Sequence, residues 1–534
     1  MIIEISKNDL IKLVGKEMSN GEIEDLLFNL KCEAEFVADN VSVEINPDRL
    51  DMVSVEGIAR AMKAYLGLPA KELKIEDSKF TINGESEVRP IFLAAIVEGV
   101  EMTDELVKSL MQIQEKLHGS VGRDRKKVAI GVHDLDTIQG LAIEYHDVDD
   151  ITFVPLQETR EMNIKQILNE HPKGKTYAHL LNDSYPVFTD KEGVLSFPPI
   201  INSDRTKVTS KTKNLFIDVT GTDRKAVEQC LNIILTNIVE RKGVIKTVKV
   251  NKEKFPKLNP SSIIITKEEI NNLLGLELDE TQIKSYLEKM LYTVKAKGGR
   301  ITVSIPPYRS DILHPVDIIE DVAIGYGYDK FVPTVPKLAT IGNLSEKEVF
   351  TRKVRETMIG FGFNEFLNFV LSSKENNFDN MLTGGEAVEL VNPVSSEYSV
   401  CRTWITPSLV KVLSHNLHNE YPQKIFEVGD IVLFDNSKET KTRTVRCLAG
   451  AISHDNANLT EIKSIVEGVL NEIGIKFDIK SINHPSFIPT RCGEIFVNTK
   501  SIGFFGELHP RVLEKWGLER SVISFEINLE GLYG

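Results

Sequence analysis

The sequence predicts an α+β multidomain protein. We expect two helix-rich repeat modules of winged-helix type, a mixed α/β domain between them, and a C-terminal antiparallel sheet with flanking helices. Three observations lead to this prediction: an internal repeat, a change of pattern between its two copies, and short glycine-punctuated strands after the second copy. The 534 residues are enough for roughly three to five domains.

The internal repeat defines the two modules. Residues 3–68 match residues 263–328 at a constant offset of 260, without a gap, and 15 of the 66 aligned positions are identical. Each copy predicts a strand, a helix, a glycine, a second helix, a strand, a proline turn and a third helix. We therefore expect a first module over 1–85 and a second over 261–335.

Between the two copies the pattern becomes that of a mixed α/β domain, expected over 86–255. In the segment Thr103–His118 the apolar residues recur at helical spacing. A second amphipathic helix is expected over Arg224–Val239. The strands predicted for this domain are Ile91–Gly99, Val128–Val132 and Phe216–Thr220.

After the second copy, a proline-spaced linker at Pro333–Pro336 leads to the C-terminal domain, expected over 340–534. This domain opens with a helix through Arg355 and Met358. Strands of this length, separated by glycines and turns, predict an antiparallel sheet with helices beside it. The expected strands are Glu365–Leu371, Lys424–Phe434, Arg446–Ser453, Gly493–Gly503 and Ser521–Leu529.

Composition and charge restrict the possible classes of function. The net charge of −14 argues against a chain that coats nucleic acid, although a local basic surface remains compatible with it. The sequence contains no apolar run of the 18 or more residues that a membrane-spanning helix needs. The segment that follows Met1 has no apolar signal core, so we expect a cytoplasmic protein that does not bind a membrane.

The segment Pro306–Asp321 carries a dense group of acids. It begins where the alternating strand Ile301–Ile305 ends, because proline cannot donate to a sheet. His314–Pro315 then opens a helix, with proline at its favoured first position.

Four carboxylates are expected to converge at the start of this helix. Asp317, Glu320 and Asp321 are spaced i, i+3 and i+4, so they share one helix face, and Asp311 lies in the preceding turn. The segment has no nearby lysine, so these acids repel one another unless a cation neutralises them. A hard divalent cation such as Mg²⁺ is one explanation, and a solvated acidic face that favours the helix dipole is the other.

The first copy of the repeat serves as a control for this segment. It keeps Pro47, Arg49 and Asp51, the counterparts of Pro307, Arg309 and Asp311, but at the positions of the other three acids it has Gly57, Arg60 and Ala61. The shared residues therefore belong to the fold. We infer that Asp311 also has a structural role, such as bonding Arg309 or the backbone at the turn.

This acidic segment resembles the signature of the β subunit of phenylalanyl-tRNA synthetase, of the shorter archaeal or eukaryotic type. Further matching runs are Asn46–Arg49, Gly131–Asp134, Asn392–Ser395, Ile425–Gly429 and Gly506–Pro510. The resemblance implies that Asp311, Asp317, Glu320 and Asp321 bind Mg²⁺. It also implies tRNA(Phe) and an α subunit as partners in an α₂β₂ tetramer, with ATP and phenylalanine bound by the α subunit.

The resemblance also implies that the C-terminal half is similar to a class II synthetase catalytic domain. Arg402 lies where an arginine that binds the α-phosphate would be sought, but the late Gly-rich run ending in arginine is missing. Gly503–His509 is the nearest candidate, and the next arginine is Arg511, beyond a proline. We therefore expect a catalytically inactive fold that docks the α subunit.

In the family, the central domain is an editing domain that hydrolyses tyrosine wrongly attached to the tRNA. The positions that match the family's pocket are Val187, Ser196, Asp218 and Thr220. Asp218 and Thr220 are two apart on a strand, so they point to one side. Such polar groups can bind the phenol hydroxyl, and phenylalanine would leave them unpaired. The alternative for Asp218 is a capping or turn residue near Gly221.

Basic residues gather in this same domain and suit an approaching tRNA end, although each could equally belong to a solvated face. They are Arg123, Arg125, Lys126, Lys127, Lys207, Lys211 and Lys213. His133 and Asp134 resemble an acid–base pair, but neighbouring strand residues point to opposite faces, so we predict structural roles for both.

Three functions remain to be distinguished at this point. The first is a ligase β subunit that supports charging by the α subunit and edits mischarged tRNA. The second is a purely structural, tRNA-positioning subunit with a decayed editing site. The third is a free-standing metal-dependent hydrolase built on the acidic cluster, which would have no use for the inactive C-terminal half.

Overall fold

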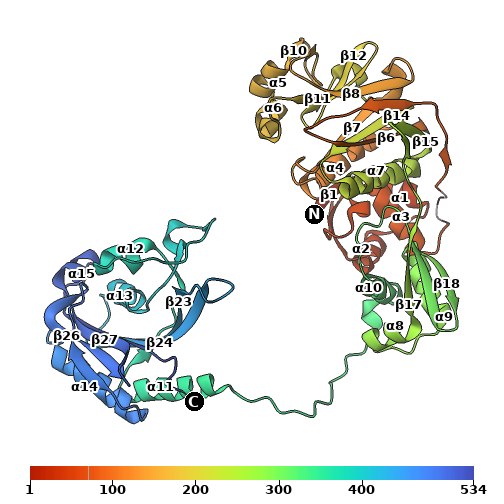
Figure 1. Ribbon diagram of the computed structural model, residues 1–534. Helices are drawn as coiled ribbons and strands as arrows, with labels where there is room; N and C mark the ends of the chain where they lie inside the picture. The colour runs from red at the N-terminus through yellow and green to blue at the C-terminus, as the bar shows by residue number, and fades with distance from the viewer. Residues whose placement is uncertain (70, 72, 534) are drawn as a thin grey trace. The chain divides into compact units, whose positions relative to one another are not determined.

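The computed structural model describes residues 1–69, 71 and 73–533. The chain folds into two compact units, Met1–Thr334 and Val335–Gly534 (Figure 1). The first unit contains the two repeat modules together with the mixed α/β region between them. The second contains the C-terminal sheet.

The two repeat modules have the same order of elements, as the internal repeat predicts. In each module a three-stranded sheet packs with three helices, and the third strand in sequence lies in the middle of the sheet. The first module consists of β1 (Ile2–Ser6), α1 (Lys7–Val14), α2 (Asn20–Asn29), β2 (Cys32–Val37), β3 (Asn40–Ile45) and α3 (Val55–Tyr65). The second consists of β17 (Ser261–Thr266), α8 (Lys267–Leu274), α9 (Glu280–Lys289), β18 (Thr293–Lys297), β19 (Arg300–Ile305) and α10 (Pro315–Tyr326).

Local sequence explains where the module helices start and stop. The Ser6 side chain accepts from the Asp9 backbone N–H and caps α1, and Gly15 ends that helix with φ 77°. Thr266 and Gly275 do the same for α8. The sequence prediction lacked one strand in each copy, because β2 and β18 each have a single buried residue and so little apolar alternation.

The central region forms one large mixed sheet. Eleven strands in the described residues pair along the order β13-β12-β11-β8-β5-β15-β6-β14-β7, with β16 and β4 also on β15. Residues 75–84, which we had assigned to the first module, supply β4 and β5 to this sheet. The strands are β4 (Ile75–Glu76), β5 (Thr81–Gly84), β6 (Ile91–Val100), β7 (Val128–Asp134), β8 (Ala142–Val148), β11 (Tyr185–Asp190), β12 (Gly193–Phe197), β13 (Ile201–Asn202), β14 (Leu215–Gly221), β15 (Lys242–Val250) and β16 (Glu253–Phe255).

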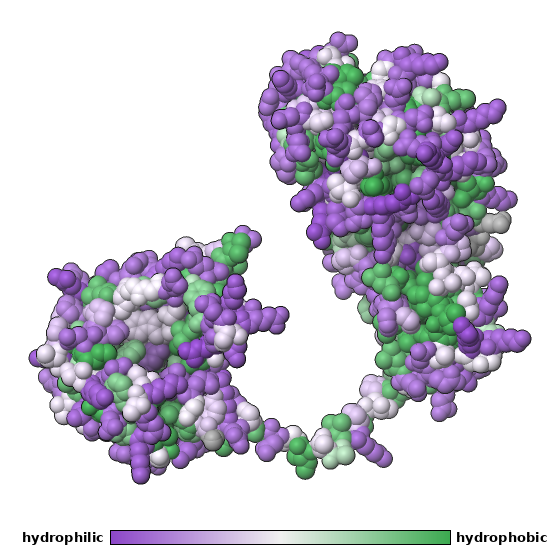
Figure 2. All heavy atoms as spheres, in the orientation of Figure 1, coloured by the Kyte–Doolittle hydropathy of each residue, from purple (hydrophilic) through white to green (hydrophobic). Residues whose placement is uncertain are grey.

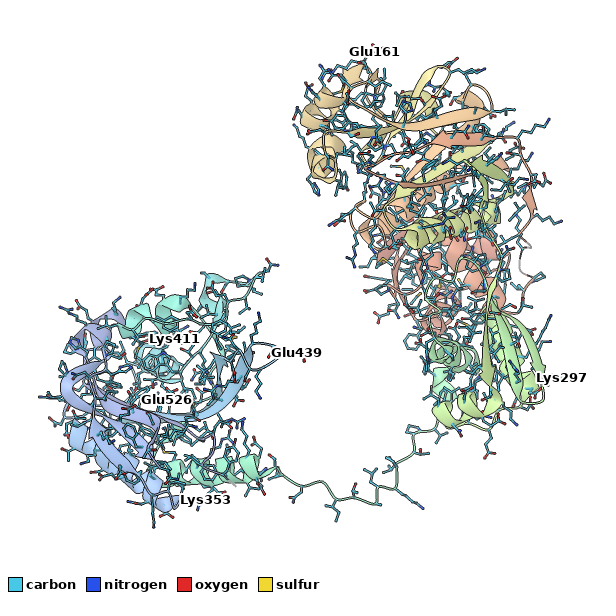
Figure 3. All side chains as sticks on the ribbon, viewed as in Figure 1. Glu161, Lys297, Lys353, Lys411, Glu439 and Glu526 are labelled. Carbon is cyan, nitrogen blue, oxygen red and sulfur yellow. The ribbon has the colours of Figure 1, made fainter. Side chains whose placement is uncertain are left out.

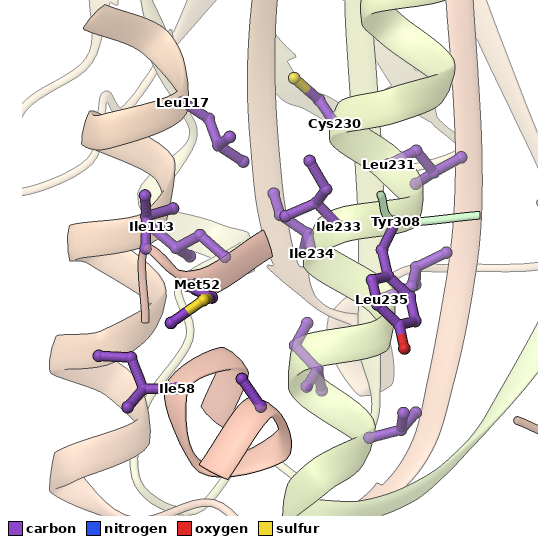
Figure 4. Close-up of a cluster of buried hydrophobic side chains, with 14 of the residues drawn as sticks. Met52, Ile58, Ile113, Leu117, Cys230, Leu231, Ile233, Ile234, Leu235 and Tyr308 are labelled. Atoms are coloured by element: carbon purple, nitrogen blue, oxygen red, sulfur yellow. The ribbon is translucent and has the colours of Figure 1, made fainter. Parts of the chain in front are cut away.

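Two helices cover this sheet and connect it to the modules. They are α4 (Asp104–Gly119) and α7 (Arg224–Ile238), each close to its predicted bounds. Figure 4 shows their apolar side chains, including Ile113 and Ile234, beside Met52 and Ile58 of the first module. These residues belong to one buried cluster that extends into the second module, so the first unit shares a continuous core. Beyond the main sheet lie a short sheet of β9 (Thr152–Phe153) and β10 (Met162–Asn163), and the helices α5 (Ile164–Glu170) and α6 (Pro172–Tyr177).

The second unit has the predicted antiparallel sheet with flanking helices. Its strand order is β20-β23-β24-β28-β27-β26-β25, and only the short β20 pairs in parallel among the described strands. The expected strand Gly493–Gly503 is instead a hairpin of β26 and β27. The strands of this sheet are β20 (Asn364–Glu365), β23 (Gln423–Phe434), β24 (Thr442–Ser453), β25 (Asp478–Ser481), β26 (Phe487–Val497), β27 (Lys500–Leu508) and β28 (Val522–Asn528). The other elements are α11 (Glu346–Gly360), β21 (Leu371–Ser372), α12 (Lys374–Asn377), β22 (Val400–Cys401), α13 (Thr406–His415), α14 (Leu459–Glu472) and α15 (Pro510–Lys515).

The segment that precedes α11 is an exposed linker. Its apolar side chains Val335, Leu338 and Ile341 are 77–98% exposed, and Figure 2 shows hydrophobic residues along this extended stretch. Across the described part of the chain, none of the helices combines the length and the apolar character required to cross a membrane.

Candidate functional site

A largely apolar cavity of the first unit lies beside the central sheet. It has a volume of about 360 Å³ and lies between α4, β7 and the turn that follows β12. Apolar side chains such as Leu110, Val132 and Phe197 form much of its wall. Its polar and charged lining is Gln114, Glu115, His118, Arg125, Gln157, His171, Lys173, Asn202, Thr206, Lys207 and Asp218. A mostly apolar cavity with a few polar side chains is typical of a small-ligand site.

Asp218 is the predicted pocket residue that lines this cavity. It lies in the middle of β14, between β6 and β7, and its side chain is only 2% exposed. Its Oδ1 lies 2.8 Å from Nε2 of His133, which is also buried. Asp218 is therefore part of the strand interior rather than a capping or turn residue.

The other three predicted pocket residues are buried but do not line the cavity. Val187 lies in an apolar cluster on β11. The Thr220 hydroxyl accepts from Nε of Arg89 at 3.0 Å. The Ser196 hydroxyl is buried and has no hydrogen-bond partner among the described residues. Their assignment to a pocket remains a prediction.

Arg125 is a half-buried member of the predicted basic cluster. Its guanidinium donates to the carbonyls of Pro199 and Ile200 at 2.9 and 2.8 Å and lies 4.5 Å from the Tyr177 ring centroid. Burial lowers the pKa of Arg125. Of the remaining basic residues, Lys207 lines the cavity. The exposed ones are Arg123, Lys126, Lys207, Lys211 and Lys213.

His118 is a cavity residue that sequence reasoning missed. It lies near the end of α4, and its Nε2 accepts from the backbone N–H of Ile130 at 2.9 Å. Burial lowers the pKa of His118 well below its usual value, so the imidazole stays neutral. Its contact with Ile130 depends on how α4 packs on β7, which sequence spacing does not reveal.

His133 and Asp134 have separate partners, in line with opposite faces of a strand. His133 contacts Asp218 and Thr206, whereas Asp134 accepts from the Thr212 hydroxyl at 2.6 Å. They do not act as an acid–base pair with each other.

The four predicted metal ligands line a second, smaller pocket of about 160 Å³ between the two repeat modules. Lys31, Asp48 and Arg49 of the first module form its other charged walls. The acids therefore converge, as their spacing predicts. Lys31 lies near them, however, so the statement that no lysine is close holds only for the local sequence.

Each acid already has a partner in this pocket. Asp317 Oδ2 accepts from the backbone N–H groups of Leu313 and His314, both at 2.7 Å, and caps α10. Glu320 pairs with Lys31 at 2.8 Å. Both oxygens of Asp311 accept from Arg309. The structural role inferred for Asp311 at the turn is thus confirmed.

Asp321 is the buried member of the four. Its Oδ2 accepts from Arg309 at 2.6 Å and from the Tyr292 hydroxyl. Burial and the neighbouring Asp321 carboxylate raise the pKa of Tyr292, so its proton stays available for this bond.

The donor chemistry and the local charge of this pocket fit a divalent cation. Around it lie six carboxylates but only four basic side chains, so two negative charges lack a counter-charge. The carboxylates are Asp48, Asp51, Asp311, Asp317, Glu320 and Asp321, and the basic residues are Lys31, Arg49, Arg60 and Arg309. Among the described residues no three His, Cys, Asp or Glu side chains stand in a metal-holding arrangement. Here Lys31 donates to Glu320 and Arg309 to Asp321.

In the second unit, Arg402 is locked into a buried ion pair. Its guanidinium donates to Glu427 at 2.6 Å and to the Asp430 carbonyl at 3.0 Å, and the side chain is 2% exposed. Gly429 leaves room for this pair, because a Cβ there would lie 2.5 Å from both partners. Arg402 is therefore not free to bind a phosphate.

Glu526 is a second buried carboxylate of this unit and lies on β28 (Figure 3). It accepts from the backbone N–H groups of Ile405 and Thr406 at 2.9 Å and from the Thr406 hydroxyl. Burial raises the pKa of Glu526 despite these bonds. Its contacts anchor the start of α13 and are structural.

Three family models match the chain. The "Phenylalanyl tRNA synthetase beta chain CLM domain" covers residues 332–529, the "tRNA synthetase B5 domain" residues 263–328, and the "B3/4 domain" residues 102–234. The second range is identical to the second copy of the internal repeat. Asp218 lies in the third, and the four acids lie in the second.

Curated relatives named "Phenylalanine--tRNA ligase beta subunit" match over nearly the whole chain. The relative from Methanococcus maripaludis is 42% identical over 99% of this chain and 100% of its own length. The one from Thermococcus kodakarensis is 41% identical, with 99% and 98% covered.

A solved structure matches the first unit. It is an N-terminal fragment of the phenylalanyl-tRNA synthetase β-subunit from Pyrococcus horikoshii, with a TM-score of 0.58 and 38% sequence identity. The match covers 61% of this chain and 99% of that fragment.

Proposed function

Because this chain belongs to the family of phenylalanine–tRNA ligase β subunits, we propose that it supports ATP-dependent charging of tRNA(Phe) by an α subunit and itself hydrolyses tyrosine wrongly attached to that tRNA. Membership in the family supports the role in charging. The editing activity rests on one observation: a buried carboxylate, Asp218, in the wall of an otherwise largely apolar cavity.

The selectivity that editing requires explains why this carboxylate matters. Tyrosine exceeds phenylalanine by one hydroxyl, and an apolar pocket cannot strongly reject an added hydroxyl. A second site that accepts a hydrogen bond from the phenol selects tyrosine instead, because phenylalanine would leave the buried acceptor unpaired. Asp218 is that acceptor in our proposal. Val187, Ser196 and Thr220 remain the other proposed pocket residues, on β11, β12 and β14.

The charges around the cavity suit the end of a tRNA. Arg125, Lys173 and Lys207 line it, and the exposed Arg123 and Lys126 lie in the loop that contains Arg125. Such residues can bind the phosphates and place the ester over the cavity. Water attacks the ester carbonyl, helped by the neighbouring hydroxyl of the terminal ribose.

The test is the release of tyrosine from mischarged tyrosyl-tRNA(Phe) by this chain assembled with its α subunit. Asp218→Asn keeps the shape but weakens the acceptor, and we expect at least about a tenfold slower release, which corresponds to about 1.4 kcal/mol. Asp134→Asn is the matched control, because Asp134 lies on the adjacent strand and outside the cavity lining. Equal rates for wild type and Asp218→Asn would favour the alternative, a tRNA-positioning subunit with a decayed editing site.

We also propose that Asp311, Asp317, Glu320 and Asp321 bind Mg²⁺ between the repeat modules. Four carboxylates on one pocket and two uncompensated negative charges support this proposal. When bound, the ion would supply positive charge and hold the modules together. Asp317, Glu320 and Asp321 each have one oxygen outside the hydrogen bonds described above, whereas Asp311 uses both oxygens for Arg309.

Metal content and thermal stability test this second proposal without reference to activity. Removing Mg²⁺ with a chelator should lower the melting temperature of the wild-type chain, and Glu320→Gln should bind less metal. An unchanged melting temperature, together with the absence of bound metal after dialysis against Mg²⁺, would eliminate the ion from the account.

For the second unit we propose docking of the α subunit, in an α₂β₂ tetramer, rather than catalysis. The buried Arg402–Glu427 pair supports this, because the arginine is unavailable to ATP. The large exposed side chains Leu367, Phe369, Val391 and Val394 offer apolar surface to a partner chain.

A further inference from the structure

A line of three buried polar side chains ends at the carboxylate of Asp218. The Thr206 hydroxyl lies 2.7 Å from Nδ1 of His133, and Nε2 of the same imidazole lies 2.8 Å from Asp218 Oδ1. All three side chains are almost completely buried. Thr206 and Asp218 line the cavity, whereas His133 lies behind them. We call this group the polar line.

The polar line is a product of the sheet register. Asp218 on β14 lies directly opposite Gly131 on β7, and His133 follows two residues later on the same face of β7. His133 and Asp218 are thus diagonal neighbours across two strands. Thr206 comes from the 3₁₀ turn Asp204–Thr206.

Gly131 provides the space for this contact. A Cβ at that position would lie 2.2 Å from Asp218 Oδ1 and 2.8 Å from His133 Nε2. The backbone φ of Gly131 is not in the left-handed region, so the conformation itself does not call for glycine. What requires glycine here is the hydrogen bond between the two side chains.

The arrangement that suits a carboxylate acceptor has the imidazole proton on Nε2, which donates to Asp218 Oδ1. Nδ1 then accepts the hydroxyl proton of Thr206, whose other acceptors, the carbonyls of Ser203 and Leu195, are 3.4–3.5 Å away. The polar line therefore presents two acceptors to the cavity, Asp218 Oδ2 and Thr206 Oγ1.

We propose that His133 and Thr206 are positioning residues that fix the Asp218 carboxylate so that Oδ2 accepts a hydrogen bond from a ligand hydroxyl, here the phenol of a tyrosyl ester. This inference rests on the editing function proposed above and specifies how that site selects its substrate. With Oδ1 held by His133, the carboxylate cannot rotate to satisfy itself when the ligand has no hydroxyl. The unpaired Oδ2 then disfavours a phenylalanyl ester.

The same three groups also occur in a rival arrangement. A hydroxyl, an imidazole and a carboxylate form the triad of many hydrolases, in which the hydroxyl attacks and the carboxylate orients the imidazole behind it. In such a triad the carboxylate lies behind the imidazole, whereas here Asp218 itself lines the cavity, together with Thr206. The variants below separate a positioning role of Thr206 from a nucleophilic one.

The test compares the kcat/KM for deacylation of tyrosyl-tRNA(Phe) and phenylalanyl-tRNA(Phe) by the chain assembled with its α subunit. His133→Leu should reduce the tyrosyl-to-phenylalanyl ratio at least about tenfold. His133→Gln, which can still donate to Asp218, should retain most of the ratio. Thr206→Val should lower the ratio less than His133→Leu, and Thr206→Ser should restore it. Gly131→Ala should lower it, because the new methyl group displaces the contact.

Thr212→Val is the matched control, because it removes a buried hydroxyl that bonds Asp134, the neighbour of His133, outside the cavity lining. Its ratio should equal that of the wild type. A folded His133→Leu protein with the wild-type ratio overturns the positioning role, and so does a His133→Gln protein that loses as much of the ratio as His133→Leu. An equal effect of Thr212→Val and Thr206→Val overturns it as well. Loss of turnover on both esters in Thr206→Val, restored by serine, would identify a nucleophile and also overturn it. If the wild type releases neither amino acid, the editing function itself fails.

Discussion

At the scale of single residues, two arginine–aspartate pairs hold equivalent turns in the two repeat modules. Arg49 donates to Asp51 at 2.9 and 3.0 Å, and Arg309 donates to Asp311 at 2.7 Å. The sequence predicted a structural role for Asp311, with Arg309 or the backbone as its partner, because the residues shared by both copies have to serve the fold. The contact of Lys31 with Glu320, 289 residues apart, could not be predicted, since it depends on how the modules pack.

We expect the free energy of unfolding of the first unit in acid to depend on the ionisation of Asp51. Burial alone would raise its pKa, but Arg49, Arg309 and Arg60 lower it from 3.8 to about 2. Its contribution to the free energy of unfolding, about 2 kcal/mol, is therefore present above pH 3.8 and lost as the pH falls through about 2. We expect Asp51→Asn to destabilise the first unit at pH 7, and the difference from wild type to shrink at pH 3. Urea unfolding at both pH values measures this.

The control for that experiment is Asp183→Asn. Asp183 is exposed and forms no ion pair among the described residues. Its variant should follow the wild type at both pH values. A constant difference between Asp51→Asn and wild type from pH 7 to pH 3 would contradict the shifted pKa.

The candidate site shows the same division between what sequence can and cannot predict. Asp218 could be identified from the family resemblance, and it does line the cavity. Its partner His133 was predicted to be structural, and its contact with Asp218 was not foreseen, because the two residues are 85 apart and meet through the strand register. Thr206 carries no motif at all. Hydrogen-bond partners across a sheet depend on pairing that local patterns do not determine.

At the scale of elements, the long periodic segments were predictable and the short ones were not. The helices α4 and α7 and the strands β6 and β14 lie within two residues of their expected bounds. Strands β8 and β11–β13 were missed, because they carry mixed polar residues and obtain their stability from neighbours in the sheet. The boundary expected at 85 falls in the loop between β5 and β6, whereas β4 and β5, before it, already belong to the central sheet.

At helix α10, the contribution of the N-terminal cap to stability can be measured separately from that of the proposed metal ion. Asp317 accepts from two backbone N–H groups at the helix start, so Asp317→Ala should lower stability by about 1 kcal/mol even in the presence of a chelator. Glu320→Ala removes only a half-exposed ion pair with Lys31. In the presence of a chelator it should therefore lower stability by at most about 1 kcal/mol, and by less than Asp317→Ala does. Melting curves with chelator and with Mg²⁺ measure both effects. An Asp317→Ala protein as stable as wild type in chelator would show that the cap contributes nothing.

At the scale of the whole molecule, each unit has its own chemistry. The first unit joins two repeat modules and a central sheet through one continuous core and carries both the cavity and the acidic pocket. In the second unit Arg402, which the resemblance made the candidate for binding a phosphate, is buried and paired with Glu427. A fold can be retained when its catalytic activity is absent, because packing and catalysis depend on different residues.

The chain alone should therefore form no phenylalanyl adenylate. We expect ATP–pyrophosphate exchange at background level for the purified chain and full exchange once an α subunit is added. Freeing the arginine by Glu427→Gln should not create activity, because the glycine-rich run that ends in arginine is also missing from the sequence. Clear exchange by the chain alone would refute the assignment of the second unit to docking.

In the function we propose, the cavity beside β7 and β14 selects a tyrosyl ester through Asp218. The most direct test of this is a crystal structure of the chain with a non-hydrolysable 3′-tyrosylamino analogue of adenosine. We predict the phenol oxygen within hydrogen-bonding distance of Asp218 Oδ2, with the tyrosyl ring against Phe197 and Val132. An analogue bound elsewhere, or bound in this cavity with its phenol turned away from Asp218, would contradict the account.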